Sequence, residues 1–371
     1  MDGQTQMDGI MPPLPIDSEL APPAENVPFA APDGDPAPPL ARTPLAECED
    51  GQRVSGVYAV RQRELRRKRN GDPWLRLLVG DASGSAEAVS WDGVEEMYAL
   101  AAPGAAVFVG GVFEISDRWG AKIKIAELRL AEDGEYEHAE LAVASEIPLE
   151  RLEADLRDLL ETVQERALRE LLDVFFAPGS PSWKRFSLAP AAKTYHQAYC
   201  HGLLEHTLSV AQAVSAAANF FPGIDRDVAV AGALLHDIGK TVAYNDDPLA
   251  IDLTDAGRLQ GEIPLGYYAV RRAIEDIPGF DPHLAQCVLH IILSHHGSLE
   301  HGSPVVPATR EAVLVHMIDN LGGRLGSFDR LERQLPEGES WSGFDRALSG
   351  SAYFAGRERP PAAAEAAPRA A

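Results

Sequence analysis

Residues 232–240 read GALLHDIGK and place a histidine beside an aspartate, His236 and Asp237, at the end of an apolar run. The run from Val228 to Leu235 is uniformly apolar, which is typical of a helix buried in a core. An imidazole and a carboxylate buried there cost several kcal/mol unless something binds them. Three interpretations are open at this point: a hydrogen-bonded pair at a helix end, a general acid and base, or two ligands of one metal ion.

More histidines and carboxylates lie at the ends and on the faces of other predicted helices. His206 lies in HGLLEHTLSV, His295 and His296 lie in ILSHHG, and Asp319 lies in VHMIDNLGG. Imidazole nitrogen and carboxylate oxygen together suit Mn²⁺, Fe²⁺, Zn²⁺ or Ni²⁺, and a cluster without thiolate is typical of a catalytic rather than a structural site. These residues therefore predict a shared divalent metal.

Helical periodicity predicts the elements that must position these side chains. From residue 148 onward, apolar residues recur at spacings of three and four. The predicted helices cover residues 149–160, 167–172, 203–214, 227–236, 265–277, 282–293 and 308–321. We expect an all-α domain over residues 148–355.

The preceding part of the chain has the pattern of β-strands. Five short runs between residues 47 and 131 are bounded by Gly, Asp and Pro, and residues 122–125 (KIKI) alternate with period two. With a short helical segment near VEEMYAL after the third run, they favour a small all-β barrel of the OB type, although another five-stranded barrel fits the spacing equally well. A charged linker, residues 132–147, joins the barrel to the helical domain.

Both ends of the chain are biased in composition. Residues 1–46 are rich in Pro, Ala and acidic residues, and residues 356–371 read similarly, so we expect a disordered acidic arm and a disordered tail. The formal net charge of −23 argues against a nucleic-acid partner, but residues 1–50 hold ten carboxylates against one arginine. Ten carboxylates less one arginine leave nine of the net negative charges in residues 1–50.

The sequence predicts neither a secretory signal nor an apolar stretch long enough to span a bilayer. Its three cysteines have no CxxC spacing, which indicates neither a disulfide framework nor a cysteine-based zinc site. We expect a cytoplasmic protein without a membrane partner.

Four segments in a fixed order resemble a known family. An early His, then His-Asp, then a distant Asp is the pattern of the HD-domain metal-dependent phosphohydrolases. More closely, the chain resembles the YhaM-type 3′→5′ exoribonucleases, in which an OB fold precedes the HD domain. The segments are PAAKTYHQAYCHGLLEHTLSVA, DRDVAVAGALLHDIGKT, LSHHGSLEHGSP and HMIDNLGGRL, with WLRLLVGDASGSAEAVSWD similar to the OB signature.

This resemblance implies roles for individual residues. The metal ligands would be His206, His236, Asp237 and Asp319, with His295 and His296 serving a second ion. Lys240 would neutralise a phosphate oxygen, and His196 would contact substrate or protonate the leaving oxygen. Glu262 stands where family members usually have His, so it is either a substituted ligand or a solvated acid.

A basic stretch, RQRELRRKRNG, falls between the first two predicted strands, where OB folds place a loop that contacts nucleic acid. The alternative is a solvated hairpin tip that happens to be cationic. The residues expected to bind nucleic acid are Arg61, Arg63, Arg66, Arg67, Lys68, Arg69 and the aromatic Trp119.

These features together predict an OB barrel followed by an HD domain that hydrolyses single-stranded RNA, and also DNA, from the 3′ end by a metal-activated water. One or two ions are expected, Mn²⁺ first, with Fe²⁺, Ni²⁺, Co²⁺ or Zn²⁺ as alternatives. The resemblance also implies a homo-oligomer. Two alternatives stay open: a phosphohydrolase of a free or cyclic nucleotide, and a nucleic-acid-binding protein whose hydrolase site is degenerate.

Overall fold

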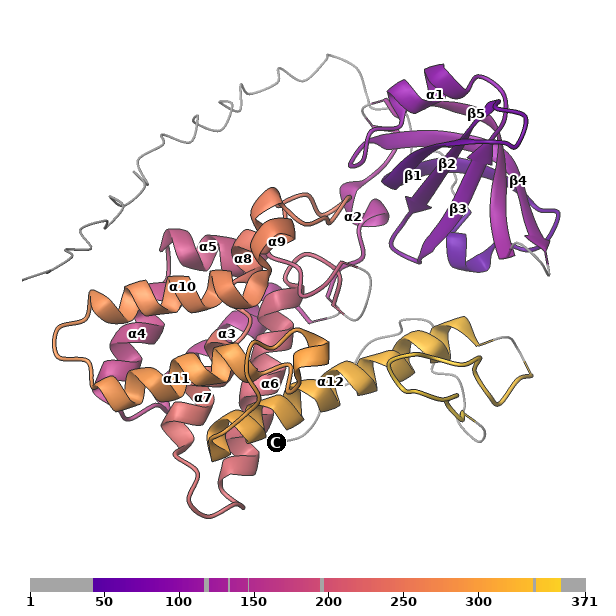
Figure 1. The fold of residues 1–371 in the computed structure, drawn as a ribbon. Coiled ribbons are helices and arrows are strands. Elements are labelled where there is room, and N and C mark those ends of the chain that lie inside the picture. The colour runs from indigo at the N-terminus through magenta and orange to yellow at the C-terminus, as the bar shows by residue number, and fades with distance from the viewer. Residues whose placement is uncertain are drawn as a thin grey trace, which may run out of the picture. The chain divides into compact units, whose positions relative to one another are not determined.

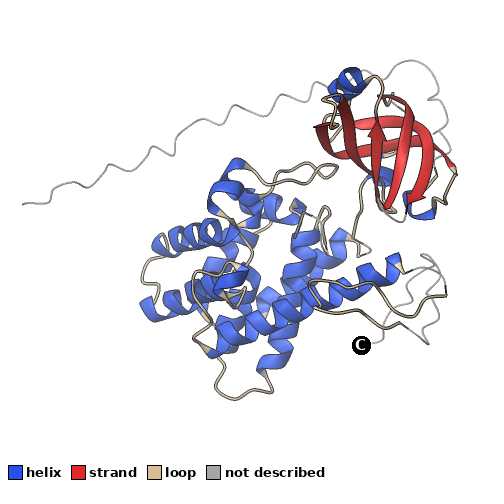
Figure 2. Cartoon of the chain, turned by 45° about the vertical axis from the view of Figure 1, so that its right-hand side comes forward, coloured by secondary structure: helices blue, strands red, loops and turns tan. Residues whose placement is uncertain are grey.

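The computed structural model describes residues 43–116, 120–132, 134–145, 147–193, 197–335 and 338–354. It contains a closed five-stranded barrel, followed along the chain by a helical domain (Figures 1 and 2). The predicted fold class is confirmed. The tail and nearly all of the predicted acidic arm lie outside the described residues. Among the described helices, none combines the length and the apolar character needed to cross a membrane.

The barrel follows the strands expected from the sequence. Its strands pair in the order β1-β2-β3-β5-β4, with β4 closing onto β1, and only the β3–β5 pair is parallel. On β2 the side chains of Leu75, Leu77 and Val79 are fully buried, as period-two alternation predicts. The elements are β1 (Arg53–Arg67), β2 (Pro73–Gly80), β3 (Ser85–Ser90), α1 (Val94–Leu100), β4 (Ala106–Ser116) and β5 (Gly120–Leu130).

The long strand β1 joins both sides of the barrel. Its first half pairs with β4 and its second half with β2, and the β1–β2 register shifts between Val60 and Gln62. Such a bulge bends a strand and allows a small sheet to close. On β4, a Cβ at Gly111 would lie 2.3 Å from the carbonyl oxygen of Lys124, so this crossing requires glycine.

The helical domain is built around α7, in which every side chain from Val228 to Leu235 is buried. Asp225 caps the helix by accepting a hydrogen bond from the backbone N–H of Val228 at 3.1 Å. Helices α6, α11 and α12 pack against α7 (Figure 1). The helices are α2 (His138–Leu141), α3 (Leu149–Glu161), α4 (Arg166–Phe176), α5 (Pro181–Leu188), α6 (Gly202–Ala218), α7 (Arg226–Leu235), α8 (Lys240–Ala243), α9 (Asp255–Gln260), α10 (Glu262–Glu275), α11 (Pro282–Ser294) and α12 (Arg310–Gln334).

The structure extends the predicted helices in two respects. The short helices α2, α5, α8 and α9 had no separate prediction, and α2 lies within the predicted linker. Helix α12 continues to Gln334, whereas its predicted end was residue 321. It passes through Gly322 and Gly323, and its last turns are packed by the C-terminal segment, where Leu331, Ala352 and Phe354 form a small apolar cluster.

Candidate metal centre

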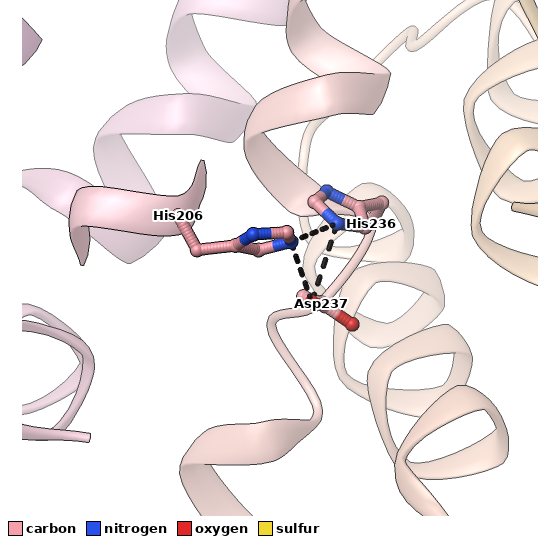
Figure 3. A group of neighbouring side chains, drawn as sticks. All are labelled: His206, His236 and Asp237. Atoms are coloured by element: carbon pink, nitrogen blue, oxygen red, sulfur yellow. Dashed lines mark hydrogen bonds and ion pairs between the residues drawn. The ribbon is translucent and has the colours of Figure 1, made fainter. Parts of the chain in front are cut away.

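Three helices of the bundle bring four of the predicted ligands together. His206 comes from α6, His236 and Asp237 directly follow α7, and Asp319 comes from α12. The Nε2 atom of His206 lies 3.3 Å from Nε2 of His236, 3.3 Å from Oδ2 of Asp237 and 3.2 Å from Oδ1 of Asp319. Figure 3 shows the two imidazoles and the Asp237 carboxylate pointing toward one another. His206 and Asp319, which are 113 positions apart in the sequence, therefore meet at one point.

A second group adjoins the first. His295 and His296 follow α11, and Nε2 of His295 lies 3.5 Å from Oδ1 of Asp237. Nε2 of His296 lies 3.7 Å from Oε1 of Glu262, in the first turn of α10. The two oxygens of Asp237 thus face different histidines, Oδ2 toward His206 and Oδ1 toward His295.

A glycine brings Glu262 close to the other residues of the site. Gly239 follows the His-Asp pair by two positions, and a Cβ there would lie 2.0 Å from the backbone oxygen of Glu262. Only glycine lets the turn after α7 pack so closely against the start of α10. The stretch HDIGK therefore supplies two predicted ligands, and its glycine allows them to lie close to Glu262.

Hydrogen bonds assign the tautomers of three histidines. The Nδ1 atoms of His236, His295 and His296 lie 2.7 Å, 2.8 Å and 2.9 Å from the backbone oxygens of Ala233, Ile292 and His301, respectively. A carbonyl oxygen only accepts, so each Nδ1 donates a proton, and in the neutral ring Nε2 is left with its lone pair. This arrangement is the one that metal-binding histidines usually have, since the second bond orients the ring.

Charges at the site shift the pKa values of the metal-free residues strongly. Burial lowers the pKa of His206, but hydrogen bonds with Asp237 and Asp319 outweigh it and raise the pKa to about 9. Burial raises the pKa of Asp237, but the nearby Lys240 and His236 outweigh it and hold the pKa well below the usual value. The carboxylates are therefore ionised at neutral pH, and the site attracts cations.

The residues present fit a divalent cation. Oδ1 of Asp237 and Nε2 of His295 are buried atoms without a hydrogen-bond partner among the described residues. His236 has its proton at Nδ1, so its Nε2 presents only a lone pair toward His206. Unsatisfied acceptors that converge in a buried place need a cation between them. Nitrogen and carboxylate donors without thiolate suit a catalytic ion of the first transition row.

Lys240 lies against this centre. Its Nζ is 2.6 Å from Oδ2 of Asp237, and its side chain is 16% exposed. Burial lowers the pKa of Lys240, but the carboxylate of Asp237 outweighs that effect and raises it. The ammonium group therefore stays charged and available to an anionic group that approaches the site.

One residue beside the site had no predicted role. Nδ1 of His316 lies 2.8 Å from the backbone oxygen of His295, and a Cβ at Gly297 would lie 2.0 Å from the His316 ring. His316 thus ties α12 to the turn that carries His295. The sequence held one signal for this role, because His316 precedes Asp319 by three residues and so shares its face of α12.

The basic residues predicted to bind nucleic acid do not form a single loop. Strand β1 carries the chain through Arg67, and only residues 68–72 form the turn to β2. Arg61 donates through Nη2 to the Leu141 carbonyl at 3.0 Å, and burial lowers its pKa. Arg63 donates to the Tyr98 carbonyl at 2.6 Å. These two guanidinium groups therefore each have a partner within the protein, and contact of Arg61 and Arg63 with nucleic acid stays a prediction.

The remaining basic residues lie toward the tip of the hairpin. Arg66 pairs with Glu64 at 2.6 Å and lies over the Trp74 ring, and Arg67 donates to the Gly71 carbonyl at 3.1 Å. The side chains of Lys68 and Arg69 are exposed at the tip itself. Two further predicted site residues, His196 and Trp119, lie outside the described residues.

Comparisons with known proteins agree with this arrangement. Residues 203–323 match the HD domain family. The chain is 30% identical over 285 residues to the 3′-5′ exoribonuclease YhaM of Geobacillus sp. (strain WCH70), an alignment that covers 73% of this chain and 82% of that protein.

Among solved structures, the chain is similar to the second OB-fold domain of replication protein A from Methanococcus maripaludis, with 14% identity, a TM-score of 0.21, and coverage of 25% of this chain and 97% of that one. It is also similar to a small single-stranded DNA-binding protein from Streptomyces coelicolor, with 17% identity, a TM-score of 0.19, and coverage of 22% and 95%. These TM-scores are too low to carry weight, and the strand order identifies the barrel. On the strength of the curated relative and the HD match, the chain belongs to the family of YhaM-type 3′-5′ exoribonucleases.

Proposed function

We propose that this chain is a metal-dependent 3′→5′ exoribonuclease that hydrolyses phosphodiester bonds of single-stranded RNA. The observation that carries the proposal is the convergence of His206, His236, Asp237 and Asp319 on one buried point. A cluster of buried acceptors without hydrogen-bond donors does not stabilise the fold, because unsatisfied polar groups destabilise a core. Its value lies in binding a cation, and the family of the chain makes that cation part of a nuclease.

The proposed centre has two cation positions, and Asp237 would contribute to both. The first cation would be held by His206, His236, Asp237 and Asp319, and the second by His295, His296 and Asp237, with Glu262 as an oxygen ligand. We propose Mn²⁺ as the ion, because this mixture of imidazole nitrogen and carboxylate oxygen donors suits it. Divalent ions at these positions supply an activated water at neutral pH and neutralise charge on the phosphate.

The side chains themselves have distinct tasks in the proposed reaction. Asp237 fixes the spacing of the two positions, because each of its oxygens faces a different group of histidines. Lys240 places a positive charge 2.6 Å from that carboxylate and would stabilise the charge that develops on a phosphate oxygen. Protonation of the leaving oxygen by His196 stays a prediction.

The barrel would hold the single strand ahead of the site. Its cationic contacts would come from Lys68 and Arg69 at the tip of the β1–β2 hairpin, with Arg66 and Arg67 beside them. Such contacts bind the phosphate backbone without reading sequence, which suits an enzyme that degrades any single strand. A single-stranded DNA would bind by the same charges, so the proposal includes DNA as a second substrate.

The test uses the full-length protein, purified without chelator, and single-stranded RNA labelled at its 5′ end in one reaction and at its 3′ end in another. With Mn²⁺, a 5′ label should yield a ladder of products that shorten one nucleotide at a time, while a 3′ label should be released at once as a mononucleotide. The reverse pattern, or cleavage within the chain, would contradict the proposed direction.

The same preparation separates the two alternatives. Turnover of free or cyclic nucleotides without any shortening of RNA would favour a small-molecule phosphohydrolase. Tight, salt-sensitive RNA binding without turnover, in the presence of each of Mn²⁺, Fe²⁺, Co²⁺, Ni²⁺ and Zn²⁺, would favour a binding protein. Asp237→Asn serves as the inactive control, because it removes the shared ligand and keeps the shape of the side chain.

A further inference from the structure

A cysteine and a histidine contact each other in the turn that precedes α6. The Sγ atom of Cys200 lies 3.6 Å from Nε2 of His201. Nδ1 of His201 is hydrogen-bonded to the backbone oxygen of Ser187, in the last turn of α5. Because a carbonyl oxygen only accepts, Nδ1 carries the proton of the neutral ring, and Nε2 presents its lone pair to the thiol. The thiol of Cys200 therefore donates to an imidazole that a third group holds in place.

This arrangement is one that activates a sulfur nucleophile. A nucleophile within reach of a base, with the base oriented by a further hydrogen bond, is the pattern of covalent catalysis. Transfer of the proton from Cys200 to His201 leaves a thiolate beside an imidazolium, and the thiolate is the form of cysteine that attacks. Cys200 is partly exposed, so a small reagent can reach it.

The surroundings of the pair favour a charged imidazole. The hydrogen bond with Cys200 raises the pKa of His201, burial opposes this effect, and the Ser187 carbonyl and the carboxylate of Glu150 add to it. Glu150 lies in the first turn of α3. A second nearby carboxylate, Glu205 in α6, accepts a hydrogen bond from the hydroxyl of Tyr199 at 2.9 Å. Both carboxylates are negative at neutral pH, and their field stabilises the imidazolium.

The backbone of His201 has a conformation that favours glycine. Its φ is 70° and its ψ is 1°, in the left-handed region, which a side chain with a Cβ disfavours. The turn is tight, because a Cβ at Gly202 would lie 2.0 Å from the backbone oxygen of Gln197. Glycine at position 201 would relieve the strain, so the imidazole is present at a cost. Strained residues of this kind are concentrated at functional sites.

The environment of Cys48 is different. Its thiol donates to the backbone oxygen of Pro44 at 3.5 Å, so its proton is directed away from any base. Burial raises the pKa of Cys48, and the carboxylates of Asp81 and Glu47 raise it further. This thiol therefore stays protonated at neutral pH.

Cys287 has a histidine neighbour but lies among carboxylates. Nε2 of His283 is 3.9 Å from its Sγ. The same cavity is lined by Asp225, Asp281 and Glu311. Burial raises the pKa of Cys287, and these three carboxylates raise it further. The chain thus contains two cysteine–histidine contacts, and only the one at Cys200 has surroundings that favour a thiolate.

We propose that Cys200 is a reactive thiol that exchanges with low-molecular-weight disulfides such as glutathione disulfide, with His201 as its base. The thiolate of Cys200 attacks one sulfur of the disulfide, and the old S–S bond breaks as the new one forms. The leaving thiolate takes up the proton that His201 received from Cys200. The products are a mixed disulfide at Cys200 and one free small thiol, so no other oxidant is required. This reaction is independent of the proposed hydrolase activity.

The first test treats the full-length protein with glutathione disulfide at pH 7. After each interval N-ethylmaleimide blocks the remaining thiols, and mass spectrometry of the peptides measures the mixed disulfide at each cysteine. Cys200 should react at least about tenfold faster than Cys48 and Cys287, which serve as controls in the same molecule. Dithiothreitol should reverse the modification.

The second test removes the base. His201→Asn keeps a residue that tolerates positive φ, so the turn should be retained. The rate at Cys200 should fall about tenfold at pH 7 but less than twofold at pH 9.5, where a thiol without a base is also largely ionised. His283→Asn is the matched control, and it should leave the rate at Cys287 unchanged.

Three outcomes would overturn the proposal. Equal rates at the three cysteines would show that the reaction proceeds through unfolded protein. Faster reaction at Cys48 or Cys287 would place the reactive thiol elsewhere. A rate at Cys200 that His201→Asn leaves unchanged, or lowers equally at both pH values, would mean that His201 is not the base.

Discussion

Charged and titratable side chains gather in two regions of this chain, the centre around Asp237 and the β1–β2 hairpin. In the centre they come from separate helices, are mostly buried and lie 2.6 to 3.8 Å apart. In the hairpin they are neighbours in sequence, and four of the six basic residues are hydrogen-bonded or ion-paired within the chain. The difference shows that burial, and not density of charge along the chain, forces polar groups to share a partner.

The largest expected effect is on Asp237, which both groups of histidines share. Asp237→Asn should lower the rate of RNA hydrolysis by on the order of 1,000-fold, because the centre loses the one negative charge that faces both positions. RNA affinity, measured by fluorescence anisotropy, should change by less than about twofold, since the barrel supplies it.

Asp276→Asn is the control for this change, because Asp276 is an exposed carboxylate at the end of α10. It should leave hydrolysis and binding as they are. If Asp237→Asn instead abolished binding and kept the rate per bound substrate, the centre would be a binding site and the contrast between the two regions would fail.

The second effect concerns protons and metal at the same centre. Because the pKa of His206 is raised to about 9 in the metal-free protein, an ion must displace a proton below that pH. The affinity for Mn²⁺ should therefore rise about tenfold per pH unit from pH 7 to pH 9 and level off above. Calorimetry in buffers of different ionisation enthalpy should detect about one proton released per first ion at pH 7. An affinity independent of pH would mean that His206 is not a ligand.

A smaller effect is expected at Glu262, whose carboxylate lies 3.7 Å from His296. Glu262→Gln should weaken the second ion by about tenfold and leave the first ion unchanged, because glutamine keeps the shape but loses the charge. Metal titrations of activity would resolve the two steps. An unchanged second step would identify Glu262 as a solvated acid.

The smallest effect is expected at the hairpin tip. The double change Lys68→Ala and Arg69→Ala should reduce the slope of log affinity against log salt by about 1.5 and weaken RNA binding a few-fold at low salt. Arg61→Ala should leave that slope unchanged and instead destabilise the barrel by about 1–3 kcal/mol, since it removes a partly buried side chain and its bond to Leu141. The opposite pattern would support contact of Arg61 with nucleic acid.

The sequence predicted the elements with strong periodicity and the metal centre that they carry. The alternation in residues 122–125 and the apolar run of α7 left little choice of structure, and the order of His206, His236, Asp237 and Asp319 matched a family. The extent of β1 was harder to predict, because Arg61 to Arg67 lack an apolar alternation and become strand only through pairing with β2. The strand propensity of a segment does not take account of the neighbouring strand with which it pairs.

The length of α12 was underestimated for a related reason. Gly322 and Gly323 disfavour a helix by about 1 kcal/mol each, and they predict its end at residue 321. The helix continues because the C-terminal segment packs on Leu331, a contact between residues that no local pattern reveals. In the same way, the role of His316 depends on a hydrogen bond to the backbone of His295, and backbone partners leave no trace in sequence.

The two-sided carboxylate of Asp237 has a consequence for how the protein acquires its ions. In the proposed centre, Oδ2 faces His206 and Oδ1 faces His295, so two cations would draw on the same negative charge. Because like charges repel, a cation at one position would weaken binding at the other, and loading should be stepwise. A scarce supply of metal would then leave half-filled molecules, and the protein would respond to metal levels gradually.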